Sequence, residues 1–418
     1  YNGRTTLYPV RGAMSDRSFD QPILFSDDSL PDSSRVDRVP VPAAVPYGSG
    51  LPQPMALMPD AERAFWVAWN RVRGVGPARF GRLIELFGDA TTAWRAPVHD
   101  LRATGFDERL IADIERQRQA IDPDAEMARL ERLQIAAITL HDPEYPRLLR
   151  EIPLPPAVLY VRGELLPADE RAIAIVGTRR VSAYGRQTTQ QLARELAEQG
   201  MTIVSGLARG IDGIAHTAAL DAGGRTLAVL GCGPDMVYPP EHANLAARIV
   251  AQGAVISEFA AGMRPEAGNF PARNRIISGM SSAVLVTEAP EKSGALITTR
   301  FAADQGRDVM AVPGSIFSRT SVACNRLIQD GALCVTSVAD IINALNIHLL
   351  PQQMDMRALL PADATEARLL ELLADEPRYV DDLCRDADLS AAVVSSTLIM
   401  LELKGLVRNL GNMTYGRA

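Results

Sequence analysis

Residues 172–179 have the sequence AIAIVGTR, and residues 202–210 have the sequence TIVSGLARG. Each stretch begins with a short apolar run and ends in small residues followed by arginine. An apolar run without alternation is typical of a strand that is buried on both faces of a parallel sheet. The two stretches lie about 30 residues apart, the length of one strand, helix, strand unit. Together they predict an α/β fold.

Five more runs of the same kind follow, at 226–230, 254–257, 283–287, 308–312 and 333–336. Helical segments separate most of them. This alternation predicts a Rossmann-like, doubly wound parallel sheet in the region 136–350. Ligands of such sheets bind at the carboxyl ends of the strands, so the residues after each strand are the first candidates for a site.

The flanking regions differ from this core in composition. Residues 1–58 are rich in proline and polar residues, which predicts a disordered leader. Residues 59–135 have helical periodicity and contain the turn Gly74-Val75-Gly76-Pro77, which is typical of a helix-hairpin-helix (SAM-like) domain. This turn either contacts DNA phosphate or belongs to a small helical packing domain. A linker is expected at 351–362.

The segment 363–418 has the pattern of a winged helix, with three helices followed by a short hairpin. It contains 6 basic and 10 acidic residues, so its net charge is −4. Because a DNA-reading helix needs cations, we expect this domain to bind a protein partner or to dimerise.

Composition restricts the class of protein further. The net charge of −7 argues against nucleic acid as a ligand, but residues 171–335 contain 16 Arg and Lys against 13 Asp and Glu. The four cysteines are far apart and predict neither a disulfide framework nor a zinc site. Without an apolar run of roughly 20 residues or a signal peptide, we expect a cytoplasmic protein with no membrane contact.

Several enzyme motifs are absent. The sequence lacks the Walker phosphate loop, the H-E-x-x-H metal motif and the G-x-S-x-G nucleophile elbow. The first core strand is not followed by G-x-G-x-x-G, which argues against a nicotinamide-dependent dehydrogenase. We therefore predict no catalytic residue, no metal site and no cofactor.

Small residues beside arginine at two strand ends predict an anion-binding site. Backbone N–H groups can approach a phosphate closely where side chains are small, and arginine adds forked donors. The candidate DNA-binding residues at these two ends are Gly177, Thr178, Arg179, Ser205, Gly206 and Arg209.

A third candidate segment combines an aromatic residue with cations and amides. It contains Asn269, Phe270, Arg273, Asn274 and Arg275. A base can stack on an aromatic ring while arginines contact the backbone of single-stranded DNA. The alternative is that Phe270 is a core residue and that an arginine pairs with an acid such as Glu258.

Five further residues are candidates for a pocket. Asp212 and His216 lie four apart on one helical face and are either an acid and base pair or, the interpretation we favour, a buried histidine beside a helix-capping aspartate. Glu288 ends a strand and precedes Ser293 and Gly294. A single carboxylate without a nucleophile or metal cluster does not make an enzyme.

The ordered set of these motifs resembles the DNA processing protein A (DprA, also called Smf) family. The resemblance spans about 165 residues and rests on Ile175-Val176-Gly177-Thr178-Arg179, Ser205-Gly206-Leu207-Ala208-Arg209-Gly210-Ile211-Asp212, Ala215-His216, Gly231-Cys232-Gly233, Tyr238-Pro239, Ser257-Glu258-Phe259, Phe270-Pro271-Ala272-Arg273-Asn274-Arg275-Ile276-Ile277 and Ser293-Gly294-Ala295-Leu296-Ile297-Thr298.

The resemblance implies a non-enzymatic protein of natural transformation. Such a protein binds and protects incoming single-stranded DNA, loads the recombinase RecA past single-strand-binding protein, and forms homodimers through the Rossmann-like domain. The lysine that the family often has just before the aromatic is absent, because residues 265–269 are PEAGN. The alternative is a nucleotide-binding or nucleotide-hydrolysing enzyme related to nucleoside-monophosphate phosphoribohydrolases. The P-G-G-x-G-T motif of those enzymes is absent.

Overall fold

The computed structural model of the 418-residue chain describes residues 58–345, 364–373, 377–403, 406–411 and 413–417. Residues 1–57 of the predicted leader and the whole predicted linker 351–362 lie outside the described residues.

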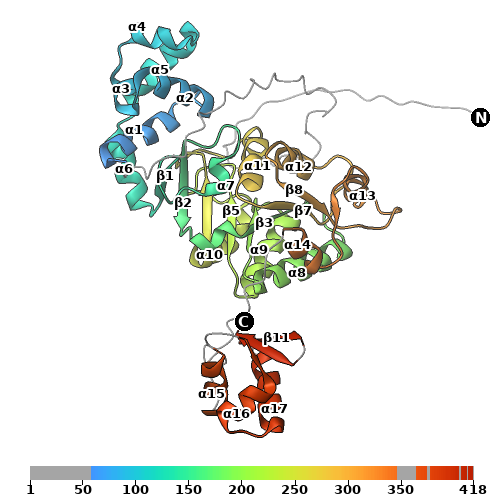
Figure 1. Cartoon of the computed structure of the whole chain (residues 1–418). Helices are drawn as coiled ribbons and strands as arrows, with labels where there is room; N and C mark the ends of the chain where they lie inside the picture. Colours follow the sequence, from blue (N-terminus) through green and yellow to red (C-terminus); the bar gives the residue numbers. More distant parts are fainter. Residues whose placement is uncertain (1–57, 346–363, 374–376, 404–405, 412, 418) are drawn as a thin grey trace, which may run out of the picture. The chain divides into compact units, whose positions relative to one another are not determined.

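A nine-stranded sheet forms the centre of the described core, in the order β1-β2-β6-β5-β4-β3-β7-β8-β9 (Figure 1). Strands β3 to β9 pair in parallel, whereas β1 and β2 add an antiparallel edge. All seven predicted strands are confirmed to within two residues, but β1 and β2 were not predicted. The strands are β1 (Ala136–Thr139), β2 (Val158–Gly163), β3 (Ala172–Val176), β4 (Thr202–Ser205), β5 (Thr226–Val229), β6 (Ala254–Ser257), β7 (Ala283–Val286), β8 (Asp308–Ala311) and β9 (Leu333–Cys334).

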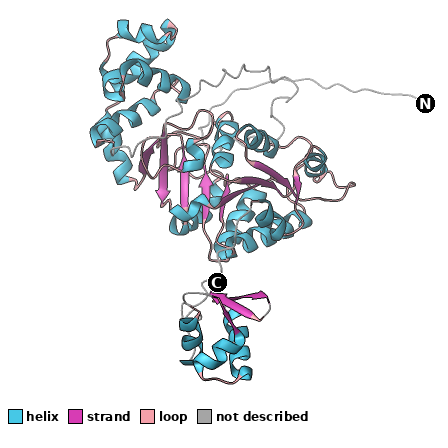
Figure 2. Ribbon diagram, in the orientation of Figure 1, coloured by secondary structure: helices cyan, strands magenta, loops and turns pink. Residues whose placement is uncertain are grey.

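Helices cover both faces of this sheet (Figure 2). Alternate residues of β3 show why: Ile173 and Ile175 pack against the face with α8, α9 and α14, whereas Ala174 and Val176 pack against α7, α11, α12 and α13. This two-sided burial explains the continuous apolar runs. The core helices are α7 (Arg147–Arg150), α8 (Ala183–Glu198), α9 (Ile211–Asp221), α10 (Ala243–Gln252), α11 (Asn269–Gly279), α12 (Ala295–Asp304), α13 (Val322–Gln329) and α14 (Val338–Ala344).

The strand order reverses between β3 and β7. From β3 the chain proceeds to β4, β5 and β6 on one side, and it then crosses back through α11 to β7, β8 and β9 on the other. This is the topological switch point of a doubly wound sheet, where a crevice opens at the carboxyl ends of the strands. The loops after β3 and β7 therefore border the position at which a ligand is expected.

Short helices make up the region before β1. Helices α1 (Asp60–Arg71) and α2 (Pro77–Phe87) flank the predicted hairpin turn, in which Gly74 has a φ of +92°. They are followed by α3 (Ala90–Arg95), α4 (Val98–Leu101), α5 (Glu108–Ala120) and α6 (Pro123–Arg132). Trp66 and Trp69 of α1 belong to the same buried cluster as Val158 and Tyr160 of β2.

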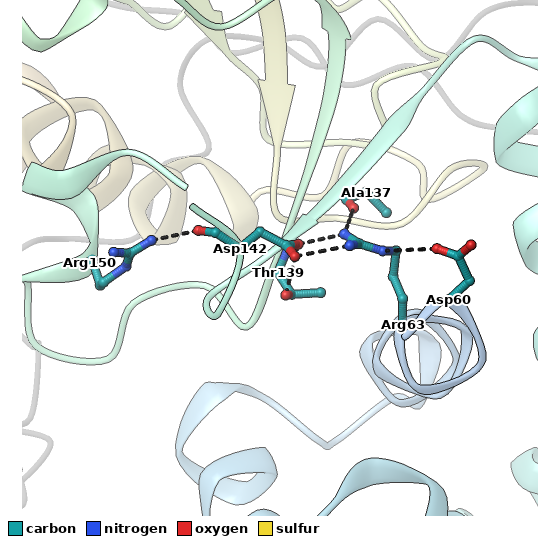
Figure 3. A network of polar contacts seen from close by, with 6 residues as sticks. All are labelled: Asp60, Arg63, Ala137, Thr139, Asp142 and Arg150. Atoms are coloured by element: carbon teal, nitrogen blue, oxygen red, sulfur yellow. Dashed lines mark hydrogen bonds and ion pairs between the residues drawn. The ribbon is translucent and has the colours of Figure 1, made fainter. Parts of the chain in front are cut away.

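A buried ion pair fixes α1 against the first strand (Figure 3). The Asp142 carboxylate accepts hydrogen bonds from Nη1 and Nη2 of Arg63 at 2.5 and 2.9 Å, and from the backbone N–H of Thr139 at 2.6 Å. Arg63 also donates to the carbonyl of Ala137, and Arg150 donates to the carbonyl of Asp142. The side chain of Asp142 is only 2% exposed, so this network holds the helical region and the sheet edge together.

The C-terminal domain has the predicted winged-helix form. It contains α15 (Ala364–Leu372), α16 (Val380–Ala387) and α17 (Ala391–Leu403), with a sheet in the order β10-β12-β11. These strands are β10 (Arg378–Tyr379), β11 (Val407–Gly411) and β12 (Thr414–Arg417). Buried leucines and valines of the three helices form its core.

Two further findings concern the cysteines and the helices. All four cysteines have free thiols, and Cys232 and Cys324 are buried. Among the helices that the structure describes, none is long and apolar enough to cross a membrane.

Candidate functional site

The loop after β3 is held at the switch point by backbone contacts. The Thr178 N–H donates to the Glu288 carbonyl at 2.8 Å, which joins this loop to the end of β7. A Cβ on Gly177 would lie 2.5 Å from Cγ1 of Ile211, so only glycine fits there. Arg179 is exposed and forms no ion pair with any residue that the structure describes. The predicted Gly177-Thr178-Arg179 turn thus presents an exposed guanidinium at the carboxyl edge of the sheet.

The loop after β4 packs directly against the loop after β3. Gly210 has a φ of +81°, and a Cβ there would lie 2.3 Å from the carbonyl oxygen of Thr178. Ser205 is fully buried and donates to the carbonyl of Ile175 at 2.6 Å, so its hydroxyl is occupied within the sheet. Arg209 pairs with Glu241 at 2.5 Å. The two predicted anion-binding turns are therefore adjacent. Of their candidate arginines, Arg209 has an ion pair and Arg179 has none among the described residues.

Asp212 and His216 have separate structural partners. The buried Asp212 carboxylate accepts the backbone N–H groups of Gly206 and Ala208 at 3.1 and 3.4 Å. Burial raises the pKa of Asp212, and the nearby charge of Arg273 partly opposes this shift. His216 shares a hydrogen bond with the Thr226 hydroxyl at 2.6 Å, and burial lowers its pKa to about 3. These contacts favour the buried structural interpretation over an acid and base pair.

Arg273 and Arg275 are predicted to contact phosphate, and both donate hydrogen bonds within the protein. Arg273 is only 4% exposed, and its guanidinium donates to the carbonyl of Gly206 at 2.7 Å and also to that of Val229. Arg275 donates to Glu258, and the two side chains are 14% and 11% exposed. Both arginines thus make contacts within the protein, although Arg273 Nε and Arg275 Nη1 have no hydrogen-bond partner among the described residues. Their contact with phosphate stays a prediction. The observed contacts favour the alternative of pairing within the protein, and sequence alone cannot separate a buried arginine from an exposed one.

Phe270 has features of both a core residue and an accessible stacking residue. The ring is partly buried over Gly231, where a Cβ would lie 3.0 Å from Cδ1 of Phe270. Its centroid is 5.5 Å from that of Tyr238, which is 40% exposed. Asn269 begins α11, and Asn274 donates to the Gly294 carbonyl at 3.4 Å. Phe270 and Tyr238 thus form an aromatic pair beside the end of β5 that is still accessible.

Glu288 joins two loops of the predicted pocket through hydrogen bonds. One carboxylate oxygen accepts the Ser182 N–H at 2.9 Å, and the other accepts the Thr320 hydroxyl at 2.5 Å. Ser293 accepts the Ala295 N–H at 3.3 Å and, with Gly294, leads into α12. Across the described residues, no group of three or more His, Cys, Asp or Glu side chains could hold a metal ion.

Three cations of the same kind as Arg179 are not among the site residues predicted from the sequence. Arg264, Lys292 and Arg319 are exposed, and none forms an ion pair within the described part of the chain. They lie in the loops that follow β6, β7 and β8. The signal that could have identified all three is their position after a predicted strand. We call Arg179, Arg264, Lys292 and Arg319 the strand-end cations.

Comparisons with known proteins agree with these motifs. The family model described as DNA recombination-mediator protein A matches residues 136–346, and the DprA winged helix domain matches residues 354–413. Protein Smf of Synechocystis sp. is 37% identical over 397 residues, which are 86% of this chain and 100% of that protein. DNA processing protein DprA of Bacillus subtilis is 43% identical over 212 residues, which are 50% of this chain and 71% of that protein.

A solved structure extends this likeness to three dimensions. The X-ray structure of DNA processing protein A from Streptococcus pneumoniae has a TM-score of 0.59 and 34% identity, and the match covers 67% of this chain and 97% of that chain. A matching family model over half of the chain and a relative aligned over its full length show that this chain belongs to the DNA recombination-mediator protein A (DprA/Smf) family.

Proposed function

We propose that this protein binds single-stranded DNA without sequence preference and mediates recombination in natural transformation. In this role it protects incoming DNA and loads RecA onto it in the presence of single-strand-binding protein. The observation that carries the proposal is the set of four strand-end cations beside the accessible Tyr238 and Phe270 pair. Unpaired cations and a stacking surface are the two elements that such binding requires.

The sheet arranges these cations along one edge. In the strand order, β6 and β8 are five positions apart, with β3 and β7 between them. At 4.7–4.9 Å per strand, the cations are distributed over about 24 Å. A DNA strand that crosses the carboxyl ends of the sheet would meet them in turn, with its bases free to stack on Phe270. The net charge of −7 does not oppose this path, because the acidic excess is concentrated elsewhere.

The alternative of nucleotide hydrolysis is not favoured by the carboxylates of the site. Both oxygens of Glu288 accept protein hydrogen bonds, from Ser182 and Thr320. Asp212 is occupied by the backbone of the loop after β4. A catalytic carboxylate must reach a substrate proton or carbon, and neither group is free to do so. Incubation with nucleoside monophosphates is therefore expected to release no base.

The first experiment compares DNA binding by the full chain and one charge variant. We expect the protein to bind a single-stranded oligonucleotide more tightly than the same sequence in duplex form. Arg179→Gln should weaken this binding and reduce the slope of log affinity against log salt by about 0.7.

The matched control is Arg248→Gln. Arg248 is an exposed arginine that pairs with Asp221 at the end of α9, beside the amino ends of the strands. It should leave affinity and slope unchanged. Equal slopes for wild type and Arg179→Gln would refute the assignment of this residue to phosphate.

The winged-helix domain is the candidate surface for protein partners. The net charge of the winged-helix domain is −4, and α17 exposes Val393, Ile399 and Met400 but contains no Arg or Lys. An apolar helix surface without a cation, on an acidic domain, suits a protein contact better than a DNA contact. We therefore assign this domain to partner binding or to the homodimer. Sedimentation of the full chain and of Met400→Glu, with and without RecA, tests both roles.

A further inference from the structure

The loop between β8 and α13 exposes two large apolar side chains. Ile316 and Phe317 are 81% and 91% exposed, more than any other large apolar residue that the structure describes. The same loop carries the strand-end cation Arg319, two residues after Phe317. Figure 1 places this loop between the end of β8 and the start of α13. An aromatic ring that is this exposed has no packing role in the monomer.

The loop is nevertheless anchored by its polar residues. Asn325 exchanges two hydrogen bonds with the backbone of Gly314, at 3.1 and 3.0 Å. The Ser315 hydroxyl accepts the N–H of Phe317 at 3.2 Å. Because both ends of the turn are held, the ring is presented to solvent by a defined backbone and not by a free segment. A preorganised ring loses less entropy when a ligand stacks on it.

Glu288 connects this loop to the loop that carries Arg179. Its Oε1 accepts the Thr320 hydroxyl, and its Oε2 accepts the backbone N–H of Ser182. Its carbonyl also accepts the N–H of Thr178. The side chain is 1% exposed, so the connection is shielded from water. The two cation-bearing loops therefore share one buried anchor at the switch point.

The spacing between Phe270 and the exposed ring fits a nucleic-acid strand. Phe270 packs over Gly231 at the end of β5, and Phe317 follows β8. Four strand spacings separate β5 from β8, which is about 19 Å. At about 3.4 Å per stacked nucleotide, this distance corresponds to roughly six nucleotides. Arg179 and Lys292 follow the strands that lie between the two rings.

We propose that Phe317 is a second base-stacking residue, at the opposite end of the DNA path from the Tyr238 and Phe270 pair, and that Glu288 positions its loop. This inference rests on the proposed function. The strand would cross the carboxyl ends of β5, β4, β3, β7 and β8, with phosphates on the strand-end cations and bases on the two aromatic positions. The cation beside Phe317 favours a polyanion over an apolar protein surface.

The test uses the full chain and thymidine oligonucleotides of two lengths. Phe317→Ala should weaken binding of an oligonucleotide of about 12 nucleotides by about 5- to 150-fold, the effect of one lost stacking contact. An oligonucleotide of about 4 nucleotides is too short to reach both rings, so its affinity should change little. Phe317→Trp should restore the binding of the longer oligonucleotide, and Ile316→Ala, the matched apolar control, should not weaken it.

Other outcomes distinguish failure of the Phe317 stacking inference from failure of the proposed DNA binding. If wild type binds and Arg179→Gln weakens binding, but Phe317→Ala has no effect at either length, the stacking inference is wrong and the proposed function stands. If Phe317→Ala and Ile316→Ala leave DNA affinity unchanged and shift sedimentation to a smaller species, the loop is a contact between copies of the chain. If wild type binds neither oligonucleotide, the proposed function itself fails.

Discussion

Arg273 is buried, whereas Arg179, which we propose to contact DNA, is exposed. The guanidinium of Arg273 donates to the carbonyls of Gly206 and Val229. Burial lowers the pKa of Arg273 to about 10, so the group stays protonated at neutral pH. A hydrogen bond from a charged donor contributes about 1.5–3 kcal/mol, so two of them contribute about 3–6 kcal/mol. This is a large part of the 5–15 kcal/mol that typically stabilises a domain.

We therefore predict that Arg273→Ala lowers the free energy of unfolding by about 3–6 kcal/mol, whereas Arg179→Ala changes it by less than about 0.5 kcal/mol. Urea denaturation followed by circular dichroism measures both. The exposed, unpaired Arg179 serves as the control for loss of a positive charge at the same edge. A stable Arg273→Ala protein that has lost a salt-dependent DNA contact would refute the reasoning, because the guanidinium would then have to face phosphate and not the two carbonyls.

Three further predictions concern the buried network, one titrating group and one glycine. Asp142→Ala leaves Arg63 with only the exposed Asp60, at 4.0 Å, as an acidic partner among the described residues and should cost about 3–5 kcal/mol in urea denaturation; a loss below about 1 kcal/mol would contradict the buried pair. The pKa of His216 is about 3 in the folded state and 6.5 in the reference state, so its contribution is present above pH 6.5 and is lost as the pH falls toward 3. Between pH 7 and 5, wild type should thus lose about 2 kcal/mol more stability than His216→Gln, and parallel curves would oppose this. Gly185→Ala would place a Cβ 2.1 Å from Oε2 of Glu288, so it should cost about 1–3 kcal/mol and weaken DNA binding, and a neutral result would show that the Glu288 contacts are dispensable.

Matched controls accompany two of these variants. Arg147→Ala removes an exposed ion pair with Glu151 and should cost at most about 1 kcal/mol. Gly294→Ala adds a Cβ with nothing within 4 Å, so it should be nearly neutral.

The strands of the core could be predicted because burial on both faces leaves a continuous apolar run. Ile173 and Ile175 contact one helical layer and Val176 the other, so no position between them tolerates a polar residue. Strands β1 and β2 were missed because their pairing is antiparallel and joins residues far apart, such as Ala136 and Val161. Their short runs carry little periodicity by themselves.

The position of the candidate residues after the core strands could be predicted from the sequence, but their burial could not. The Gly177-Thr178-Arg179 turn follows from glycine and strand order, because a close approach to Ile211 excludes a side chain. The burial of Arg273 depends on α11 crossing the sheet ends, a long-range contact that no local pattern encodes. Lys292 and Arg319 lie in loops whose strand ends become neighbours only in the folded sheet.

The measurement that tests the account most directly is the salt dependence of single-stranded DNA binding by the quadruple Gln variant of Arg179, Arg264, Lys292 and Arg319. Four lost phosphate contacts predict a slope of log affinity against log salt that is smaller by about 2.8 than that of wild type. Unfolding by urea should be unchanged, since none of the four cations has an ion pair among the described residues. A variant that binds with the wild-type slope would contradict the claim that DNA crosses the carboxyl ends of this sheet.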